Sequence, residues 1–281
     1  MESIVIHVLT DLHMKDIDGN PNHVESIGEQ GLFYAVPANF RTYAQIANKE
    51  NPDVVLLLGD CFHGSCPPNK FMEIWESIHS PKLLTLGNHD LDIYDSKELA
   101  TFFGYSNQPI VAGSSFNQVY VIRKGNMSCR IIMLDSSFDE ANQQSNHWQH
   151  CKLHDAALDW LQAQFEENQE DYILLCSHVS PHQFDSNHLY FEKQAKQIAT
   201  IVQAYTTLHP EVKVMSMAGH SHPEQPEHFS NLGLMFPGIV FPPMIRHRQE
   251  TPSGGPNGVY SVVELRVGEY QVGMEWVEYR E

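Results

Sequence analysis

The sequence predicts an α/β protein with four layers, α/β/β/α, in which two mixed sheets pack together and helices flank them. Apolar, β-branched runs alternate with amphipathic stretches through residue 218, as parallel strands and crossover helices do. A hairpin pattern interrupts this alternation near the middle of the chain, and the residues after 238 read as strands alone. Strands of both directions in this order indicate two packed sheets with helices on the outer faces.

The first hundred residues predict three strands, each followed by a helix. Pro37 opens the first helix, and Asn51-Pro52 ends it. Ser96 and Glu98 suit the first turn of the third helix. We expect strands at 4–9, 53–58 and 82–86, and helices at 37–49, 69–78 and 96–103.

The rest of the chain begins with the predicted hairpin, because Gly125-Asn126 lies between two strand-like runs. Leu158, Leu161 and Phe165 then recur at spacings of three and four, which predicts an amphipathic helix. We expect helices at 154–168 and 188–208, and strands at 118–123, 128–134, 172–176, 212–218, 239–241, 259–265 and 270–279.

The domain organisation is predicted to be simple. No repeat, low-complexity tract or linker interrupts the 281 residues, so we expect a single domain over 1–281. Segments rich in polar residues, Gly and Pro join the predicted elements. We expect four of them to form long rim loops, at 14–36, 136–149, 183–190 and 223–232.

Composition and the start of the chain set the expected location. The hydrophobic fraction is 42%, and no apolar run approaches the roughly 20 residues of a membrane span, so no membrane partner is expected. Glu2 follows Met1 without a basic stretch, and we expect a cytoplasmic protein. Five cysteines, an odd number with no CxxC pair, are expected to be reduced thiols.

Polar strings follow five of the predicted strands, at the point where each strand ends. Functional side chains in open α/β sheets gather at that edge. In the first and last strings, a spacing of two points both side chains to one side of an extended segment. The strings are Asp11-Leu12-His13, Gly59-Asp60, Gly87-Asn88-His89-Asp90, Ser177-His178 and Gly219-His220-Ser221-His222.

Together and in this order, the five strings resemble the ligand set of the calcineurin-like metallophosphoesterase superfamily. Each string alone is weak evidence, because short His and Asp motifs often arise by chance. The resemblance spans nearly the whole chain and implies a dinuclear metal site that hydrolyses a phosphate ester by attack of metal-bound hydroxide. The expected cofactors are two divalent or trivalent ions, Mn, Fe, Zn or Co, since His, Asp and Asn ligands accept any of these.

The resemblance also implies a role for each polar residue of the strings. Asp60 would bridge the two metals. His89 would donate a proton to the leaving oxygen, and Asp90 would orient His89 and raise its pKa. The terminal ligands would be Asp11, His13 and His222 for the first metal, and Asn88, His178 and His220 for the second.

Two more histidines are candidate substrate-binding residues. His182 follows His178 by four positions. His63 lies three residues after Asp60, where purple acid phosphatases carry a metal-binding Tyr. That difference, together with Asp11-Leu12-His13 in place of their DxG, argues against the purple acid phosphatase branch. Three other histidines, at 147, 150 and 154, could share a helix face, but solvated surface histidines explain them equally well.

The most similar branch is the bacterial class III cyclic nucleotide phosphodiesterase-like group. The GNHD string, Pro223 after the last string, a later Pro-rich strand and the length carry this resemblance. The absence of Arg over 61–65 and Asp90 in place of Glu argue against a serine/threonine protein phosphatase. We therefore expect a phosphodiesterase for small phosphodiesters, with cyclic nucleotides among the candidate substrates. The alternative is a broad-specificity phosphomonoesterase or nucleotide phosphatase.

The net charge of the chain limits the classes of partner that we expect. The chain carries 17 Lys and Arg against 35 Asp and Glu, a formal charge of -18, which repels polyanions at long range. Nucleic acid is therefore not an expected partner, and a nuclease is disfavoured. Metal ions would invert the field locally, so a small phosphate ester is the expected partner. An inactive scaffold is also disfavoured, because every ligand of the family is retained. The oligomeric state is left open.

Overall fold

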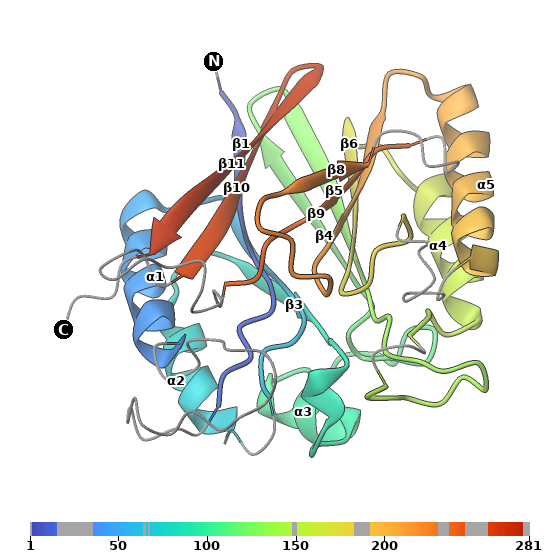
Figure 1. Ribbon diagram of the computed structural model, residues 1–281. Coiled ribbons are helices and arrows are strands. Elements are labelled where there is room, and N and C mark those ends of the chain that lie inside the picture. The colour runs from blue at the N-terminus through green and yellow to red at the C-terminus, as the bar shows by residue number, and fades with distance from the viewer. Residues whose placement is uncertain are drawn as a thin grey trace.

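Two sheets lie between two sets of helices in the computed structural model (Figure 1). Helices α1 (Val36–Glu50) and α2 (Pro68–Ser77) cover one outer face, and α4 (Ala156–Glu166) and α5 (Glu192–Leu208) cover the other. The predicted four-layer arrangement is confirmed. The structure describes residues 2–15, 36–63, 66, 68–147, 151–182, 192–229, 236–244 and 258–277.

The first sheet has five strands in the order β11-β10-β1-β2-β3. Its centre is parallel, and its other edge is an antiparallel hairpin that pairs with the first strand. The strands are β1 (Ile4–Leu9), β2 (Val54–Leu58), β3 (Lys82–Thr85), β10 (Gly258–Arg266) and β11 (Glu269–Val277).

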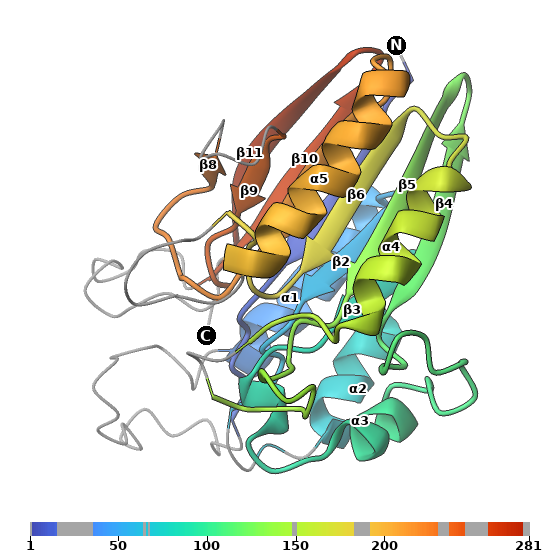
Figure 2. The ribbon, with the colours of Figure 1, turned by 90° about the vertical axis from the view of Figure 1, so that its right-hand side faces the viewer.

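The second sheet has six strands in the order β4-β5-β6-β7-β9-β8, with antiparallel pairs at both edges and parallel pairs between them. Figure 2 shows α4 and α5 lying along its outer face. The strands are β4 (Gln118–Lys124), β5 (Met127–Leu134), β6 (Tyr172–Ser177), β7 (Lys213–Ala218), β8 (Glu227–Phe229) and β9 (Gly238–Val240).

The central core lies between the two sheets. On β1, Ile6 and Val8 point into it, and on β5, Ile131 and Met133 meet them from the other sheet. Because side chains alternate along a strand, the intervening residues pack under the helices instead: Leu9 joins the core beneath α1, α2 and α3 (Ser96–Phe102). A third core beneath α4 and α5 completes the layers.

Most predicted boundaries agree with the structure to within one or two residues. The helix α3 (Ser96–Phe102) begins one residue after Asp95, whose side chain accepts hydrogen bonds from the backbone of Lys97 and Glu98, each at 2.9 Å. Glu98 accepts in return from the Asp95 amide, which makes a capping box.

One predicted rim loop was wrong in part, because 223–232 contains β8. This strand has three residues and no alternation of apolar and polar side chains, so the sequence carries no strand signal there. The predicted loop residues 16–35, 148–149, 183–190 and 230–232 lie outside the described part of the chain. Among the described helices, none combines the length and the apolar character that a membrane span requires.

Candidate metal centre

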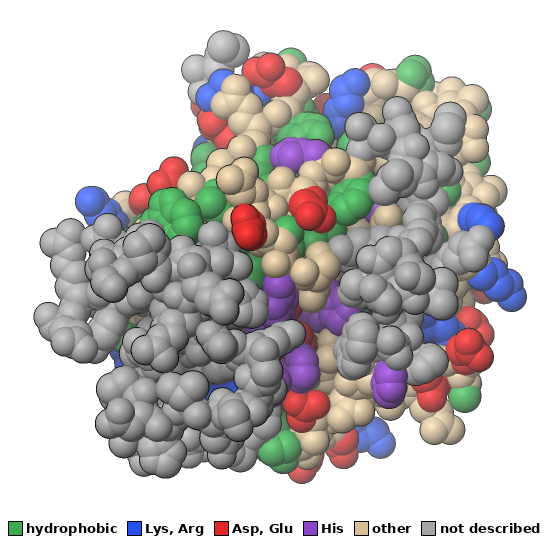
Figure 3. Space-filling view, in the orientation of Figure 1, with side chains coloured by type: hydrophobic (Ala, Val, Ile, Leu, Met, Phe, Trp, Pro, Cys, Tyr) green, Lys and Arg blue, Asp and Glu red, His purple; other side chains and the backbone are tan. Residues whose placement is uncertain are grey.

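Five strand ends from the two sheets converge at one end of the molecule. β1, β2 and β3 bring the first three strings of the sequence, and β6 and β7 bring the last two. The sheets are tied together here, because Thr85 Oγ1 on β3 donates a hydrogen bond to the Leu134 carbonyl on β5 at 2.9 Å. Figure 3 shows histidine side chains gathered near the middle of this face.

Asp11, His13 and His222 form a first group whose ligand atoms lie within 4.8 Å of one another. His222 Nε2 is 3.0 Å from both Asp11 Oδ1 and His13 Nε2. The other carboxylate oxygen of Asp11 is held by donors, Thr10 Oγ1 at 2.5 Å and the His220 amide at 3.0 Å. Asp11 therefore presents one fixed oxygen to the two imidazoles.

Asp60, His178 and His220 form a second group with the same spacing. His178 Nδ1 donates to the Leu58 carbonyl at 2.8 Å, and this bond directs the lone pair of Nε2 into the group. His220 Nδ1 lies 3.1 Å from that Nε2. The imidazole of His178 is therefore oriented by the backbone and not by the site alone.

Asp60, a member of the second group, also faces the first group. Its Oδ1 accepts from the His89 amide at 2.9 Å. Its Oδ2 is 3.3 Å from His178 Nε2 in the second group and 3.7 Å from His13 Nε2 in the first. One carboxylate oxygen therefore faces ligand nitrogens on both sides, which is the geometry that a bridging carboxylate requires.

Asn88 adds an amide to this arrangement. The residue is 1% exposed, and its Oδ1 has no hydrogen-bond partner. Its Nδ2 donates to the Asn146 carbonyl at 3.4 Å. A buried amide oxygen without a donor is costly, and a cation is one partner that satisfies it.

The backbone is strained at the residues that turn these side chains inward. Five of the proposed ligand residues adopt positive φ, each costing on the order of 1 kcal/mol. Gly59, at φ +90°, shows why only glycine fits beside Asp60: a Cβ there would lie 2.7 Å from His178 Nδ1. The five residues are Asp11 (52°), His13 (47°), Asp60 (52°), His220 (72°) and His222 (51°).

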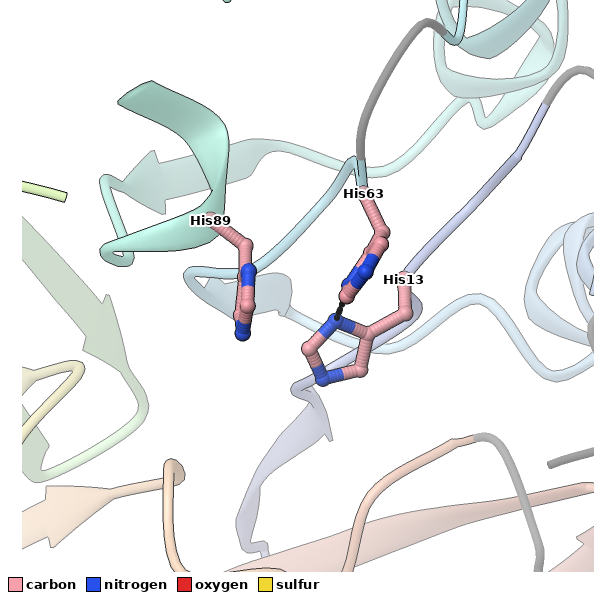
Figure 4. A group of neighbouring side chains, drawn as sticks. All are labelled: His13, His63 and His89. Carbon is pink, nitrogen blue, oxygen red and sulfur yellow. Dashed lines mark hydrogen bonds between the residues drawn. The ribbon is translucent and has the colours of Figure 1, made fainter. Parts of the chain in front are cut away.

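A third group consists of His13, His63 and His89, drawn in Figure 4. His63 Nδ1 lies 3.4 Å from His13 Nδ1, on the side of the ring away from Asp11. The rings of His63 and His89 stack with centroids 4.4 Å apart and planes 29° from parallel. In-plane lone pairs of two stacked imidazoles do not converge on one point, so this group is a poorer chelate than the other two.

His89 is held by Asp92 and not by Asp90. Its Nδ1 lies 3.0 Å from Asp92 Oδ2. The carboxylate of Asp90 instead accepts from the amides of Phe62 at 3.0 Å and Gly87 at 2.9 Å. The expected Asp90 contact is therefore corrected: in the 3-10 turn His89–Leu91, adjacent side chains diverge, and the residue three positions on returns to the same side.

Burial and neighbouring charges set the protonation of the site. Burial opposes ionisation of Asp60, but the His178 imidazole holds the pKa of that carboxyl well below its usual range. Burial also lowers the pKa of His13 to about 3, which keeps its nitrogen available as a ligand. For Asp90, burial and the Asp60 charge raise the pKa to about 7.

The remaining predicted site residue, His182, is not brought to these groups. Its side chain is fully buried, and its ring packs against Phe229 and Phe236. Neither ring nitrogen has a hydrogen-bond partner, and burial lowers the pKa of His182 to about 4. A side chain sealed in this way has no atom to offer a substrate.

Three residues that the sequence did not single out also belong to the site: Thr10, Asp92 and Asn146. Asp92 lies three positions after His89, a spacing that a turn brings together. Asn146 lies in a loop far along the chain, where no pattern predicts its contact.

The residues present suit a dinuclear metal site. Two groups of nitrogen and carboxylate donors flank one shared carboxylate, and an orphaned amide oxygen lies with them. This chemistry agrees with the family match: calcineurin-like phosphoesterases match residues 4–224. The chain belongs to the calcineurin-like phosphoesterase family, whose members depend on two metals to hydrolyse phosphoesters.

Named relatives are similar in sequence or in fold. The human tartrate-resistant acid phosphatase type 5 is 25% identical over 237 residues, 77% of this chain and 70% of its own length. A dimetal phosphatase from Danio rerio superposes with a TM-score of 0.67 at 15% identity, covering 99% of this chain and all of its own. A 5'-nucleotidase precursor from Thermus thermophilus gives 0.55 at 15% identity, over 98% of this chain and 55% of its own.

Proposed function

We propose that the protein hydrolyses small phosphodiesters at a dinuclear metal site bridged by Asp60. The observation that carries the proposal is the position of Asp60 Oδ2, 3.3 Å from His178 Nε2 and 3.7 Å from His13 Nε2. The first metal would be held by Asp11, His13 and His222, and the second by Asn88, His178 and His220.

The bound cations would supply an activated water and neutralise the charge of the phosphate. The chain supplies rigid positions for them. Thr10 fixes the oxygen of Asp11 that does not face the imidazoles, and the Leu58 carbonyl fixes the tautomer of His178. Because these partners are preorganised, the site does not have to rearrange during the reaction.

His89 is the proposed proton donor to the leaving oxygen. Its imidazole is 32% exposed at the edge of the metal groups, so a substrate can reach it. Burial opposes its protonation, but the hydrogen bond to Asp92 and the nearby Asp60 charge outweigh burial and raise the pKa of His89 to about 9. A protonated imidazole at this position can give its proton to a poor leaving group.

His63 is the proposed residue that borders the substrate. It stacks on His89, and burial lowers its pKa to about 4, so it faces the phosphate as a neutral hydrogen-bonding group. Its contact with His13 Nδ1 leaves His13 Nε2 for the first metal.

The proposed preference for diesters rests on charge. A phosphomonoester dianion needs more positive charge around its oxygens than a diester monoanion does. Among the described arginines, Arg123 and Arg130 pair with Glu170, Arg266 pairs with Glu264, and Arg41 lies on α1. The described cation that acts on the site is Lys15, whose charge adds to the effect of burial in lowering the pKa of His63. At the site itself, the anionic side chain of Asp92 lies beside His89. This arrangement favours the substrate with fewer charges.

Phosphomonoester hydrolysis is the second candidate. It is favoured by the activities of the similar proteins, which are named as an acid phosphatase, a dimetal phosphatase and 5'-nucleotidases. Both candidates use the same metal ligands and the same proton donor, so they differ only in the substrate that fits.

A substrate panel tests the proposal. Protein reconstituted with Mn and shown by elemental analysis to hold two metals per chain would be given bis-nitrophenyl phosphate, nitrophenyl phosphate, cyclic nucleotides, glycerophosphodiesters and a phosphoserine peptide. We expect kcat/KM for the aryl diester to exceed that for the monoester at least about tenfold, roughly 1.4 kcal/mol of transition-state stabilisation. A monoester preference would favour the second candidate, and fewer than one metal per chain would overturn both.

A further inference from the structure

One loop of the described chain reaches both the proposed metal ligand Asn88 and the carboxylate that holds His89. The main-chain carbonyl of Asn146 accepts from Asn88 Nδ2 at 3.4 Å. The side-chain Nδ2 of the same residue donates to Asp92 Oδ1 at 3.4 Å. The other oxygen of Asp92 lies 3.0 Å from His89 Nδ1.

The carbonyl of Asn146 decides which atom Asn88 offers to the site. A carbonyl oxygen can only accept, so the group of Asn88 that faces it must be the NH₂. The amide is planar, and its Oδ1 is then turned to the opposite side, where it is buried without a partner. An amide oxygen, and not an amide nitrogen, is the atom that metal ions bind.

The side chain of Asn146 acts on Asp92 and, through it, on His89. Asp92 is only partly buried, and a carboxylate at the surface can adopt several rotamers. A donor on Oδ1 leaves Oδ2 directed at His89, so the Asn146 amide restricts the carboxylate to the rotamer that orients the imidazole. His89 Nδ1 is then occupied, and Nε2 is the nitrogen that can face a leaving oxygen.

The loop that carries Asn146 is held in shape by its own hydrogen bonds. Phe138, which is 3% exposed, exchanges two backbone bonds with Lys152, at 3.2 and 2.8 Å. The Ser145 amide donates to the Ser137 carbonyl at 2.9 Å. Asp139 Oδ1 accepts from the amides of Ala141 and Gln143 at 2.9 and 2.8 Å. A loop with this many internal hydrogen bonds can position a residue as a strand end does.

We infer that Asn146 is a positioning residue that links the proposed metal ligand Asn88 to the proposed proton donor His89. Its carbonyl sets the amide orientation of Asn88, and its side chain sets the orientation of His89 through Asp92. The inference deepens the proposed function and rests on it for the roles of Asn88 and His89. It assigns Asn146 a role inside the site, while the rest of the loop 136–147 serves to hold Asn146 in place.

The kinetic test is a double-mutant cycle of Asp92→Ala and Asn146→Ala in the Mn-loaded protein. Outer partners of site residues are worth about 10-fold to 100-fold in activity. We expect kcat for an alkyl phosphodiester to fall about 100-fold in Asp92→Ala and about tenfold in Asn146→Ala. The double variant should match Asp92→Ala, because both changes act through the same imidazole. For bis-nitrophenyl phosphate, each loss should shrink to about threefold or less, since nitrophenolate hardly needs a proton.

Two controls come from the same loop. Gln143→Ala removes an exposed amide side chain, and Glu140→Gln removes a negative charge, with the loop otherwise unchanged. Both should keep kcat on both substrates within about twofold. Losses that add in the double variant, or that are equal for the two leaving groups, would overturn the inference.

A second measurement, by NMR, does not depend on catalytic activity. In the metal-free protein, proton NMR should show a slowly exchanging Nδ1 proton on His89 that is lost in Asp92→Ala and broadened in Asn146→Ala. The Asn88 side-chain amide should exchange at least about tenfold more slowly than that of exposed Asn107. Rapid exchange of both groups in the unaltered protein would refute the positioning role. If both are protected but no phosphoester is hydrolysed, the proposed function fails while the coupling stands.

Discussion

Two clusters of buried polar side chains lie on β1 and just after it, and they differ in whether residues of the fold satisfy their polar atoms. His7, 1% exposed, lies with its Nε2 3.3 Å from Glu50 and packs its ring against Tyr43 and Tyr260, which also contact each other. Tyr260 donates in turn to Glu50 at 3.2 Å. This cluster satisfies itself with residues of the fold.

The cluster of proposed metal ligands at the strand ends is not fully satisfied by residues of the fold. Imidazole nitrogens face each other at 3.0 Å between His13 and His222, and Asn88 Oδ1 is buried without a partner. Positive φ angles add strain at the residues that carry the ligands. A fold that accepts such costs at one place, four residues from a cluster that avoids them, has been shaped there for binding and not for stability.

The largest effect should come from Asp60→Ala, which breaks only the second cluster. The variant removes a carboxylate that faces both groups and leaves any two bound cations to repel each other. We expect both metals to be lost and kcat/KM to fall roughly 10³-fold or more, the several kcal/mol that metal ions contribute. Elemental analysis and kinetics measure both.

Asp53→Ala is the matched control for Asp60→Ala. Asp53 lies just before the other end of β2, where it accepts from the Val5 amide at 2.8 Å and pairs with Lys124 at 2.7 Å. That variant should lose stability and keep its metals. Two tightly held metals in Asp60→Ala would show that Asp60 is not the bridge.

The next effect in size is expected from His89→Ala. The variant removes the proposed proton donor but no proposed metal ligand, so metal content should stay at the level of the unaltered protein. Turnover should fall by roughly 10² to 10⁴, the usual range for a general acid. A control, His209→Ala, removes a half-exposed histidine that precedes β7, at the opposite end of that strand from the last string, and should change neither. Metal loss in His89→Ala would make it a ligand instead.

A smaller effect is expected from Thr10→Val, which keeps the shape of the side chain and removes the donor to Asp11 Oδ2. Partners of metal ligands are typically worth about 10-fold to 100-fold in metal affinity, and we expect a loss in that range. Thr85→Val is the matched control, because its hydroxyl is equally buried but bonds only the Leu134 carbonyl. Equal metal affinities in the two variants, measured by competition with a chelator, would contradict the role of Thr10.

The structure brings together the residues that the sequence placed at strand ends, and their role as metal ligands stays a prediction. Apolar runs mark where β1, β2, β6 and β7 stop, and parallel strands in one sheet bring their ends to the same edge. The four-layer order followed from the same alternation of strands and helices. Local patterns were therefore sufficient wherever a regular element carried the residue.

The parts that were missed depend on loops. The sequence paired His89 with its neighbour Asp90, but a 3-10 turn directs Asp92 to it instead. His182 was placed near the substrate because it follows His178, yet the chain after β6 turns it into an apolar pocket beside Phe236. Asn146 gave no signal, because its contacts join segments 54 to 58 residues apart.

The smallest expected effect concerns the self-satisfied cluster and its pH dependence. Burial lowers the pKa of His7 to about 4, below its ordinary value of 6.5. As pH falls through 6.5, the unfolded chain therefore binds a proton that the folded chain does not bind until pH 4, and the folded state loses stability in that window. Between pH 7.5 and 5.5 the loss from this residue is about 1.3 kcal/mol.

His7→Phe isolates that contribution, because a phenyl ring can pack against the two tyrosines and cannot be protonated. Urea unfolding of the metal-free proteins at the two pH values gives the difference directly. All other groups, the ligand histidines included, titrate alike in both proteins, so we expect the variant to lose about 1.3 kcal/mol less than the unaltered chain. Equal losses would mean that Glu50 holds the proton on His7, and that this cluster too contains a charge that the fold must accommodate.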